Sequence, residues 1–84
     1  MHIREISFTL ATPVCAASAH FEIDGTEYLI TAGKETVNVY AGRWIHDRRG
    51  VGKTFQSPEQ LAGHYKKHGS EILRFANRIC HWGN

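Results

Sequence analysis

Hydrophobic and polar residues alternate along the first half of the chain with the two-residue period of half-buried β-strands. The alternation marks four segments, at residues 6–10, 15–23, 26–31 and 35–45. Asp24-Gly25 between the second and third segments favours a two-residue hairpin turn, because both residues tolerate a positive φ. Such short strands, adjacent along the chain, predict an antiparallel β-meander.

The second strand has an apolar face that begins with small side chains, at Cys15, Ala17 and Ala19, and continues with Phe21 and Ile23. Small side chains on one face of a sheet leave room for an element to pack over them. We therefore expect a helix above this strand.

The second half of the chain has the signals of two helices. Ser57-Pro58-Glu59-Gln60 combines an N-cap residue, a proline at the first helical position and a capping-box glutamine. A first helix is predicted over residues 58–68, with Leu61 and Tyr65 facing inward and Gly69 ending it. Ser70 is predicted to cap a second helix over residues 71–82.

The predicted second helix has one apolar stripe with the spacing of a core-facing helix, formed by Ile72, Phe75, Ala76 and Ile79. Arg74 and Arg78 lie off this stripe and are expected to face solvent. The predicted fold is α+β, a single domain over residues 1–84. It is a four-stranded antiparallel β-meander followed by two α-helices packed on one face, ββββαα.

Composition limits the class of protein. The 84 residues are 42% hydrophobic, enough for one modest core, and contain no apolar run near 20 residues. Polar residues interrupt the first 19 positions, so these are not expected to form a signal peptide. Cys15 and Cys80 match no metal spacing by themselves, and free thiols in a cytoplasmic protein are the expectation.

Charge is divided unevenly along the chain. Residues 1–40 hold two Lys or Arg against five Asp or Glu, whereas residues 41–84 hold eight against three. The excess of cations in the second half suggests an acidic partner, either a nucleic acid or a protein that handles one. The alternative is that the two halves interleave in space and give a mixed surface.

Residues 41–53, AGRWIHDRRGVGK, form the strongest candidate for a contact surface. Tryptophan and arginine supply large area and oriented polar groups, and both are enriched at interfaces. The candidate partner-binding residues are Tyr40, Arg43, Trp44, Arg48, Arg49 and Lys53. The arginines could pair with acidic groups, while Trp44 serves as an anchor or, like Tyr40, stacks on a base.

Other motifs favour neither catalysis nor a cofactor. Gly50-Val51-Gly52-Lys53-Thr54 resembles the end of a phosphate-binding loop, but Asp47 stands where that motif requires a glycine, so a flexible turn is expected. His64 and His68 have the i, i+4 spacing that can hold zinc on a helix, with Cys80-His81 to complete a site. Lys66 and Lys67 would oppose a dication there. We expect no enzyme activity, no cofactor and no metal.

A resemblance to a known family begins at Phe55. The pattern F-x-S-x-E-Q-L over residues 55–61, then Tyr65, Gly69-Ser70 and the second amphipathic helix, resembles the end of a small phage-encoded anti-CRISPR family. That family inhibits the type I-F surveillance complex and combines an antiparallel sheet with two helices. The resemblance covers roughly residues 50–80. It implies binding to the backbone subunits of a CRISPR–Cas complex without chemistry, in the cytoplasm of a host cell.

Two functions follow as hypotheses. The first is a non-catalytic protein–protein inhibitor, encoded by a phage or mobile element, that binds a Cas protein or ribonucleoprotein complex and blocks target-DNA binding. The alternative is a small DNA- or RNA-binding regulator that uses the cations of residues 43–53. Neither hypothesis involves a membrane. The sequence leaves open whether the chain is a monomer or a homodimer.

Overall fold

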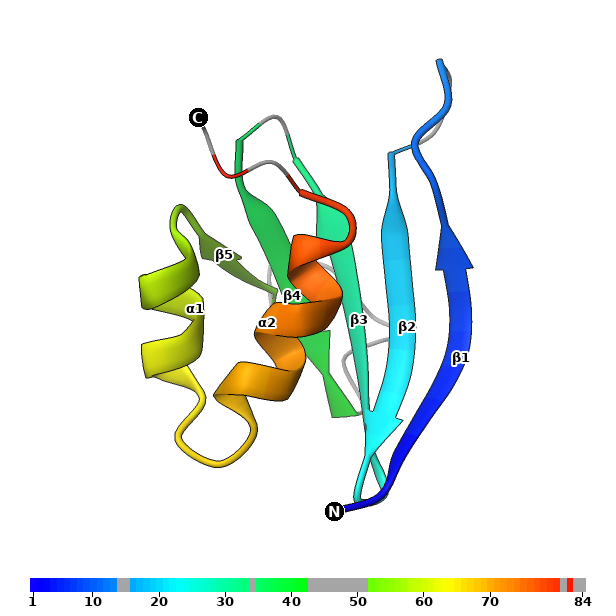
Figure 1. The fold of residues 1–84 in the computed structure, drawn as a ribbon. Helices are drawn as coiled ribbons and strands as arrows, with labels where there is room; N and C mark the ends of the chain where they lie inside the picture. Colours follow the sequence, from blue (N-terminus) through cyan, green and yellow to red (C-terminus); the bar gives the residue numbers. More distant parts are fainter. Residues whose placement is uncertain (14–15, 34, 43–51, 81, 83–84) are drawn as a thin grey trace.

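The computed structural model describes residues 1–13, 16–33, 35–42, 52–80 and 82. They form one five-stranded antiparallel sheet with two helices on one side of it (Figure 1). The strands are β1 (Ile3–Thr9), β2 (Ser18–Ile23), β3 (Thr26–Ala32), β4 (Val37–Ala41) and β5 (Lys53–Phe55), and the helices are α1 (Pro58–His64) and α2 (Gly69–Asn77). None of the described helices has the length and apolarity needed to cross a membrane.

The predicted meander is confirmed, because the spatial order of the strands is their order in the chain. Asp24 and Gly25 form the β2–β3 hairpin turn with φ values of 49° and 87°, as that dipeptide allows. The turn sets the register, in which Ile23 pairs with Thr26 and His20 with Leu29. The α+β architecture and the helices on one face of the sheet are therefore as predicted.

A fifth strand was not predicted. β5 pairs antiparallel with β4, and its last residue, Phe55, is 3% exposed in the core. Its three residues are too few to display a periodic pattern, so the sequence offered no strand signal there. Lys53 and Thr54 thus lie in a strand and not in the flexible turn expected for residues 50–54.

The first strand differs from the prediction in its inward-facing residues. The β1–β2 register shifts between Glu5 and Ser7, so that Phe8 lies opposite Ala19. Simple alternation over residues 6–10 places Ile6, Phe8 and Leu10 on one face, and the shift removes Ile6 from that face. Ile6 is 36% exposed, and Leu10, beyond the end of the strand, is 65% exposed. Simple alternation cannot represent one extra residue in a strand.

Helix α1 begins as predicted but ends earlier. Ser57 Oγ accepts a hydrogen bond from Gln60 N at 3.1 Å, and Gln60 Oε1 accepts one from Gln56 N at 2.8 Å. These bonds satisfy backbone donors at the helix start. The helix ends at His64 and not at residue 68, and the Tyr65 N–H still donates to the Leu61 carbonyl.

The start of α2 is also different from the expectation. Its N-cap residue is His68, without a side-chain cap hydrogen bond, and Gly69 is the first helical residue. Gly69 is needed for close packing of the two helices, since a Cβ atom there would collide with the Ala62 carbonyl. The glycine therefore opens α2 and does not terminate α1, and Ser70 lies inside the second helix.

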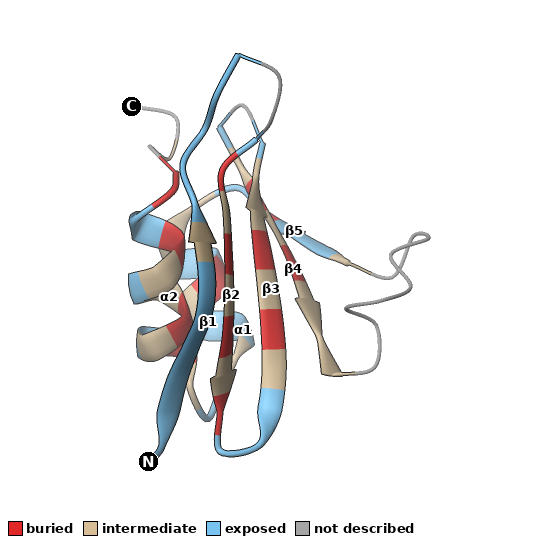
Figure 2. Ribbon diagram, turned by 90° about the vertical axis from the view of Figure 1, so that its right-hand side faces the viewer, coloured by how far each residue is buried: buried red, intermediate tan, exposed pale blue. Residues whose placement is uncertain are grey.

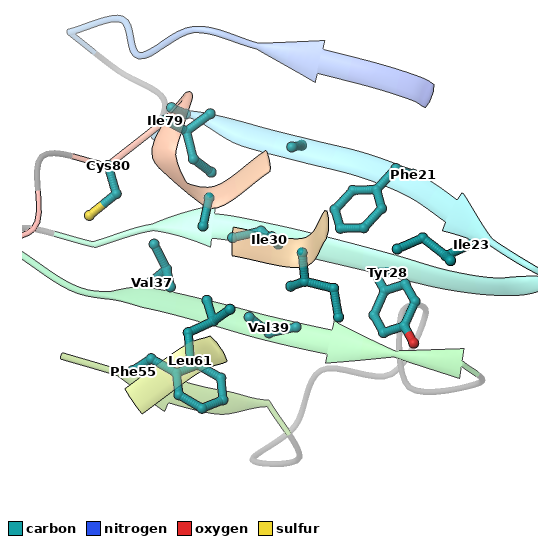
Figure 3. Close-up of a cluster of buried hydrophobic side chains, with 14 residues drawn as sticks. Phe21, Ile23, Tyr28, Ile30, Val37, Val39, Phe55, Leu61, Ile79 and Cys80 are labelled. Atoms are coloured by element: carbon teal, nitrogen blue, oxygen red, sulfur yellow. The ribbon is translucent and has the colours of Figure 1, made fainter. Parts of the chain in front are cut away.

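One apolar cluster joins the helices to the sheet (Figure 3). Phe21 stacks on Tyr28 with ring centroids 5.5 Å apart and on Phe75 of α2 at 3.9 Å. Leu61 of α1 and Ile72 of α2 are both 0% exposed. Ala17, just before β2, and Ala19 of β2 are buried; Cys15, the first of that expected set, lies outside the described residues.

Replacing Gly69 tests the contact between the helices. We expect Gly69→Ala to lower the free energy of unfolding by about 1–3 kcal/mol, the usual cost of an overpacked position. Gly63→Ala is the matched control, because no atom lies within 4 Å of a Cβ placed on Gly63 in α1. That substitution should raise stability by about 0.5–1 kcal/mol through the better helix propensity of alanine. Urea denaturation of both variants checks the pair, and equal effects would contradict the packing.

Tyr65 should make the fold sensitive to alkali. Burial raises the pKa of Tyr65 to about 12, and it also raises the pKa of Tyr28, whose ring centroid is 6.3 Å away. In the unfolded chain a tyrosine ionises near pH 10, so the unfolded state loses the proton first. The contribution of Tyr65 to stability should therefore be constant below about pH 10 and fall as the pH rises from there toward about 12. Tyr65→Phe should flatten this decline, measured as the urea midpoint at several pH values. An unchanged slope would show that Tyr65 does not cause it.

Candidate functional site

The face of the sheet opposite the helices carries the candidate site and is termed the open face. Both helices lie on the other side of the sheet, and no described helix covers this one (Figure 2). Along β2 to β5 the side chains here alternate with buried core residues, and all of them are only partly buried or exposed. By strand register the open face consists of Arg4, Ser7, Thr9, Ser18, His20, Glu22, Glu27, Leu29, Thr31, Asn38, Tyr40 and Thr54.

The central row of the open face runs across four strands, from Ser7 of β1 to Tyr40 of β4. His20 of β2 pairs with Leu29 of β3, which in turn pairs with Tyr40 of β4. Directly opposed side chains on one sheet face lie about 5 Å apart at their Cβ atoms. The row therefore places an apolar strip of Leu29 and Tyr40 beside a histidine.

A charged row lies next to this strip. Glu22 of β2 is opposite Arg4 of β1 on one side and Glu27 of β3 on the other. The Arg4 guanidinium contacts the Glu22 carboxylate at 3.1 Å. His20 Nε2 lies 3.2 Å from Glu27 Oε1 but makes no hydrogen bond to a described residue. The row carries two carboxylates against one permanent cation.

The third row is uncharged and polar. Ser18, Thr31, Asn38 and Thr54 follow one another in register across β2 to β5. The Thr54 hydroxyl donates to Asn38 Oδ1 at 2.6 Å, which fastens the short β5 to β4. Hydroxyl and amide groups in this row can bond to a partner, but they include no activated nucleophile.

Gly52 determines where the Tyr40 ring lies. A Cβ atom on Gly52 would collide with ring carbons of Tyr40, so the aromatic ring packs directly over the glycine backbone. Gly42, two residues after Tyr40, has a φ of +62°, which glycine adopts without strain. Glycine is therefore required on both sides of the basic segment, defined here as residues 43–51.

Two of the six predicted partner-binding residues are described. They lie at the same end of two neighbouring strands but on opposite faces of the sheet, because Lys53 is in register with the buried Val39. Tyr40 is near the end of β4, and Lys53 begins β5, paired with Val39. Because β4 and β5 are hydrogen-bonded neighbours, the chain enters and leaves the basic segment at one place. Arg43, Trp44, Arg48 and Arg49 lie outside the described residues.

The two histidines considered for zinc are not on one helix, because α1 ends at His64. The His64 ring packs against Phe55 at 5.4 Å between centroids, whereas His68 Nε2 lies 3.5 Å from Asp24 Oδ2. The His2 backbone N–H, 2.8 Å from the other Asp24 oxygen, lowers the pKa of that carboxyl below its ordinary value. Among the described residues, no group of three or more His, Cys, Asp or Glu side chains could hold a metal.

The sequence did not identify Leu29, which pairs with Tyr40, or His20, which pairs with Leu29, as residues of the candidate site. The signal was present, because a two-residue turn at Asp24-Gly25 fixes which residues of the flanking strands face each other. The pairing of Leu29 with Tyr40 of β4 was harder to predict from the sequence, because the longer β3–β4 turn allows several registers.

Comparisons with protein-family models, curated proteins and solved structures found no match to this chain.

Gly52→Ala tests the placement of Tyr40. The added methyl group should push the aromatic ring off the open face, while the core on the opposite face stays intact. We expect altered near-ultraviolet circular dichroism and displaced amide signals for Tyr40 and Leu29 in NMR spectra, with an unchanged far-ultraviolet spectrum. Tyr40 signals that stay in place would contradict this packing. Gly63→Ala serves as the control, because it adds the same methyl group in open space.

Proposed function

We propose that this protein is a non-catalytic binding protein that docks on a larger protein assembly and inhibits it. The observation that carries the proposal is the position of Tyr40 and Lys53. They lie on neighbouring strands where the chain enters and leaves the basic segment. Tyr40 is on the open face beside Leu29, whereas Lys53, in register with the buried Val39, is on the opposite face of the edge strand β5. An aromatic anchor next to several cations is typical of the energetic centre of an interface.

The charges of the open face favour a protein partner over a nucleic acid. Glu22 and Glu27 lie opposite each other on the open face, in the row next to Leu29 and Tyr40. Carboxylates at that position would repel a phosphate backbone laid across the sheet. A protein surface can instead offer cations to these acids and acids to Lys53 and the arginines.

A binding role also agrees with the chemistry of the described side chains. The Arg4–Glu22 pair places opposite charges together, which suits a fixed recognition surface. General acid–base catalysis would require such a group within reach of a bound substrate and a reacting partner. The neighbours on this face are hydroxyl, amide and aliphatic groups.

The resemblance over residues 50–80 makes a type I CRISPR–Cas surveillance complex the first partner to test. In this proposal the chain is encoded by a phage or mobile element and acts in the host cytoplasm. Binding would block target-DNA pairing by occupying the complex, with no bond made or broken.

Co-elution of the protein with a candidate partner tests this proposal directly. The purified protein is mixed at physiological salt with a type I-F surveillance complex and, separately, with labelled duplex DNA and single-stranded RNA. We expect co-elution with the protein assembly and an affinity that falls only modestly as salt rises. The Tyr40→Ala/Lys53→Glu variant should bind at least about tenfold more weakly, the loss expected for an interface anchor.

The matched control is Lys66→Glu/Lys67→Glu, which changes two exposed charges on the other side of the molecule. It should leave binding unchanged. Binding to nucleic acid alone, with affinity falling steeply as salt rises, would replace the inhibitor proposal with the alternative DNA- or RNA-binding function. Full binding by the folded Tyr40→Ala/Lys53→Glu variant would show that the surface is wrong.

A further inference from the structure

A groove separates β1 from α2 on the helical side of the sheet. Its cavity has a volume of about 350 Å³ and is lined by Ile3, Arg74, Phe75 and Arg78. No described helix covers β1 on this side (Figure 1). The volume lies within the range of ligand-binding pockets, and its floor is apolar.

Arg78 forms a fixed wall of the groove. Its guanidinium contacts the Glu5 carboxylate at 3.0 Å and lies over the Phe8 ring, 4.1 Å from the ring centroid. The Phe75 ring centroid is 5.8 Å away. An ion pair and a cation–π contact together hold this side chain between β1 and α2. The positive charge of Arg78 is therefore already matched by Glu5.

Arg74 lies one helical turn before Arg78, and its charge is not paired with an acidic side chain among the described residues. It is exposed, and it forms no ion pair or hydrogen bond with any described residue, although Glu71 lies three positions before it. Arg78, four positions later, is a like charge on the same helix face. An arginine with five free donors thus lies at the mouth of an apolar groove.

A second copy of the chain is a poor occupant for this groove. A twofold pairing of two β1 strands would place both α2 helices on the same side of the joined sheet. Both copies of Arg74 and Arg78 would then border one interface, with only the two already paired Glu5 carboxylates between them. Like charges across an interface disfavour association. The unmatched charge calls for an anionic partner.

We propose that the groove between β1 and α2 binds an acidic segment of another protein. One apolar side chain of the segment lies between Ile3 and Phe75, and a neighbouring carboxylate accepts two hydrogen bonds from Arg74. Planar guanidinium groups suit such bidentate recognition of a carboxylate. This surface is separate from the Tyr40 and Lys53 site, so the chain would have two docking surfaces and could bridge two proteins.

A random heptapeptide library displayed on phage provides the probe, selected at physiological salt against the whole protein. We expect enriched peptides with Asp or Glu within about two residues of an aliphatic or aromatic residue. Their synthetic versions should bind about tenfold or more weakly to Arg74→Glu, as for loss of a charge-assisted pair. Because Arg74 is exposed and unpaired among the described residues, the variant should keep the melting temperature of the unmodified protein.

Two control variants separate this groove from the site of the proposed function. Peptides held in the groove should bind Lys53→Glu and Lys66→Glu as they bind the unmodified protein. Ile3→Ser should weaken the same peptides by removing the apolar wall. No enriched acidic peptide, equal binding to Arg74→Glu, or loss of binding only in Lys53→Glu would each overturn the proposal. None of these results depends on whether the protein binds a surveillance complex.

Discussion

The stacking of Phe75 of α2 on Phe21 of β2 is the contact on which the rest of the structure depends. Among the described residues it is the closest aromatic contact between the helical layer and the sheet, with centroids 3.9 Å apart and rings within 5° of parallel. Tyr28 extends the stack along the sheet, and the aligned rings leave little freedom for α2 to shift. The position of α2 then decides which parts of the sheet are covered.

Two surfaces remain available once the helices are in place. The open face is uncovered because five strands present one apolar face, and two short helices suffice to bury it. The groove beside β1 remains because α2 packs over the centre of the sheet, while Arg78 at its C-terminal end contacts Glu5 and Phe8 of the first strand. The same packing that stabilises the domain thus separates an open-face site from a groove on the opposite side.

The sequence predicted the architecture well where local signals were strong. Alternation identified four strands, the Asp24-Gly25 turn was correct, and the Ser57 cap marked the start of α1. Errors occurred where tertiary contacts outweigh local pattern. The short β5 is held in place by Phe55, which is buried in the core. The register shift in β1 is not marked by any particular residue type in the sequence. Gly69 allows the two helices to pack closely and does not terminate the first one. Of the candidate site, the composition of residues 41–53 was visible in the sequence, whereas the row through His20, Leu29 and Tyr40 depends on strand register.

The irregularity between Glu5 and Ser7 has a consequence for how the protein behaves when abundant. β1 ends the sheet with an open row of backbone groups, and Ile3 and Ile6 on this strand are each 36% exposed. A flat apolar edge of this kind would recruit further strands and let molecules polymerise into fibrils. The bulge breaks the regular spacing of those groups, and Arg4 and Glu5 add charges that an incoming strand would have to desolvate. The outer edge of β1 is therefore a poor template for the addition of a strand from a second chain.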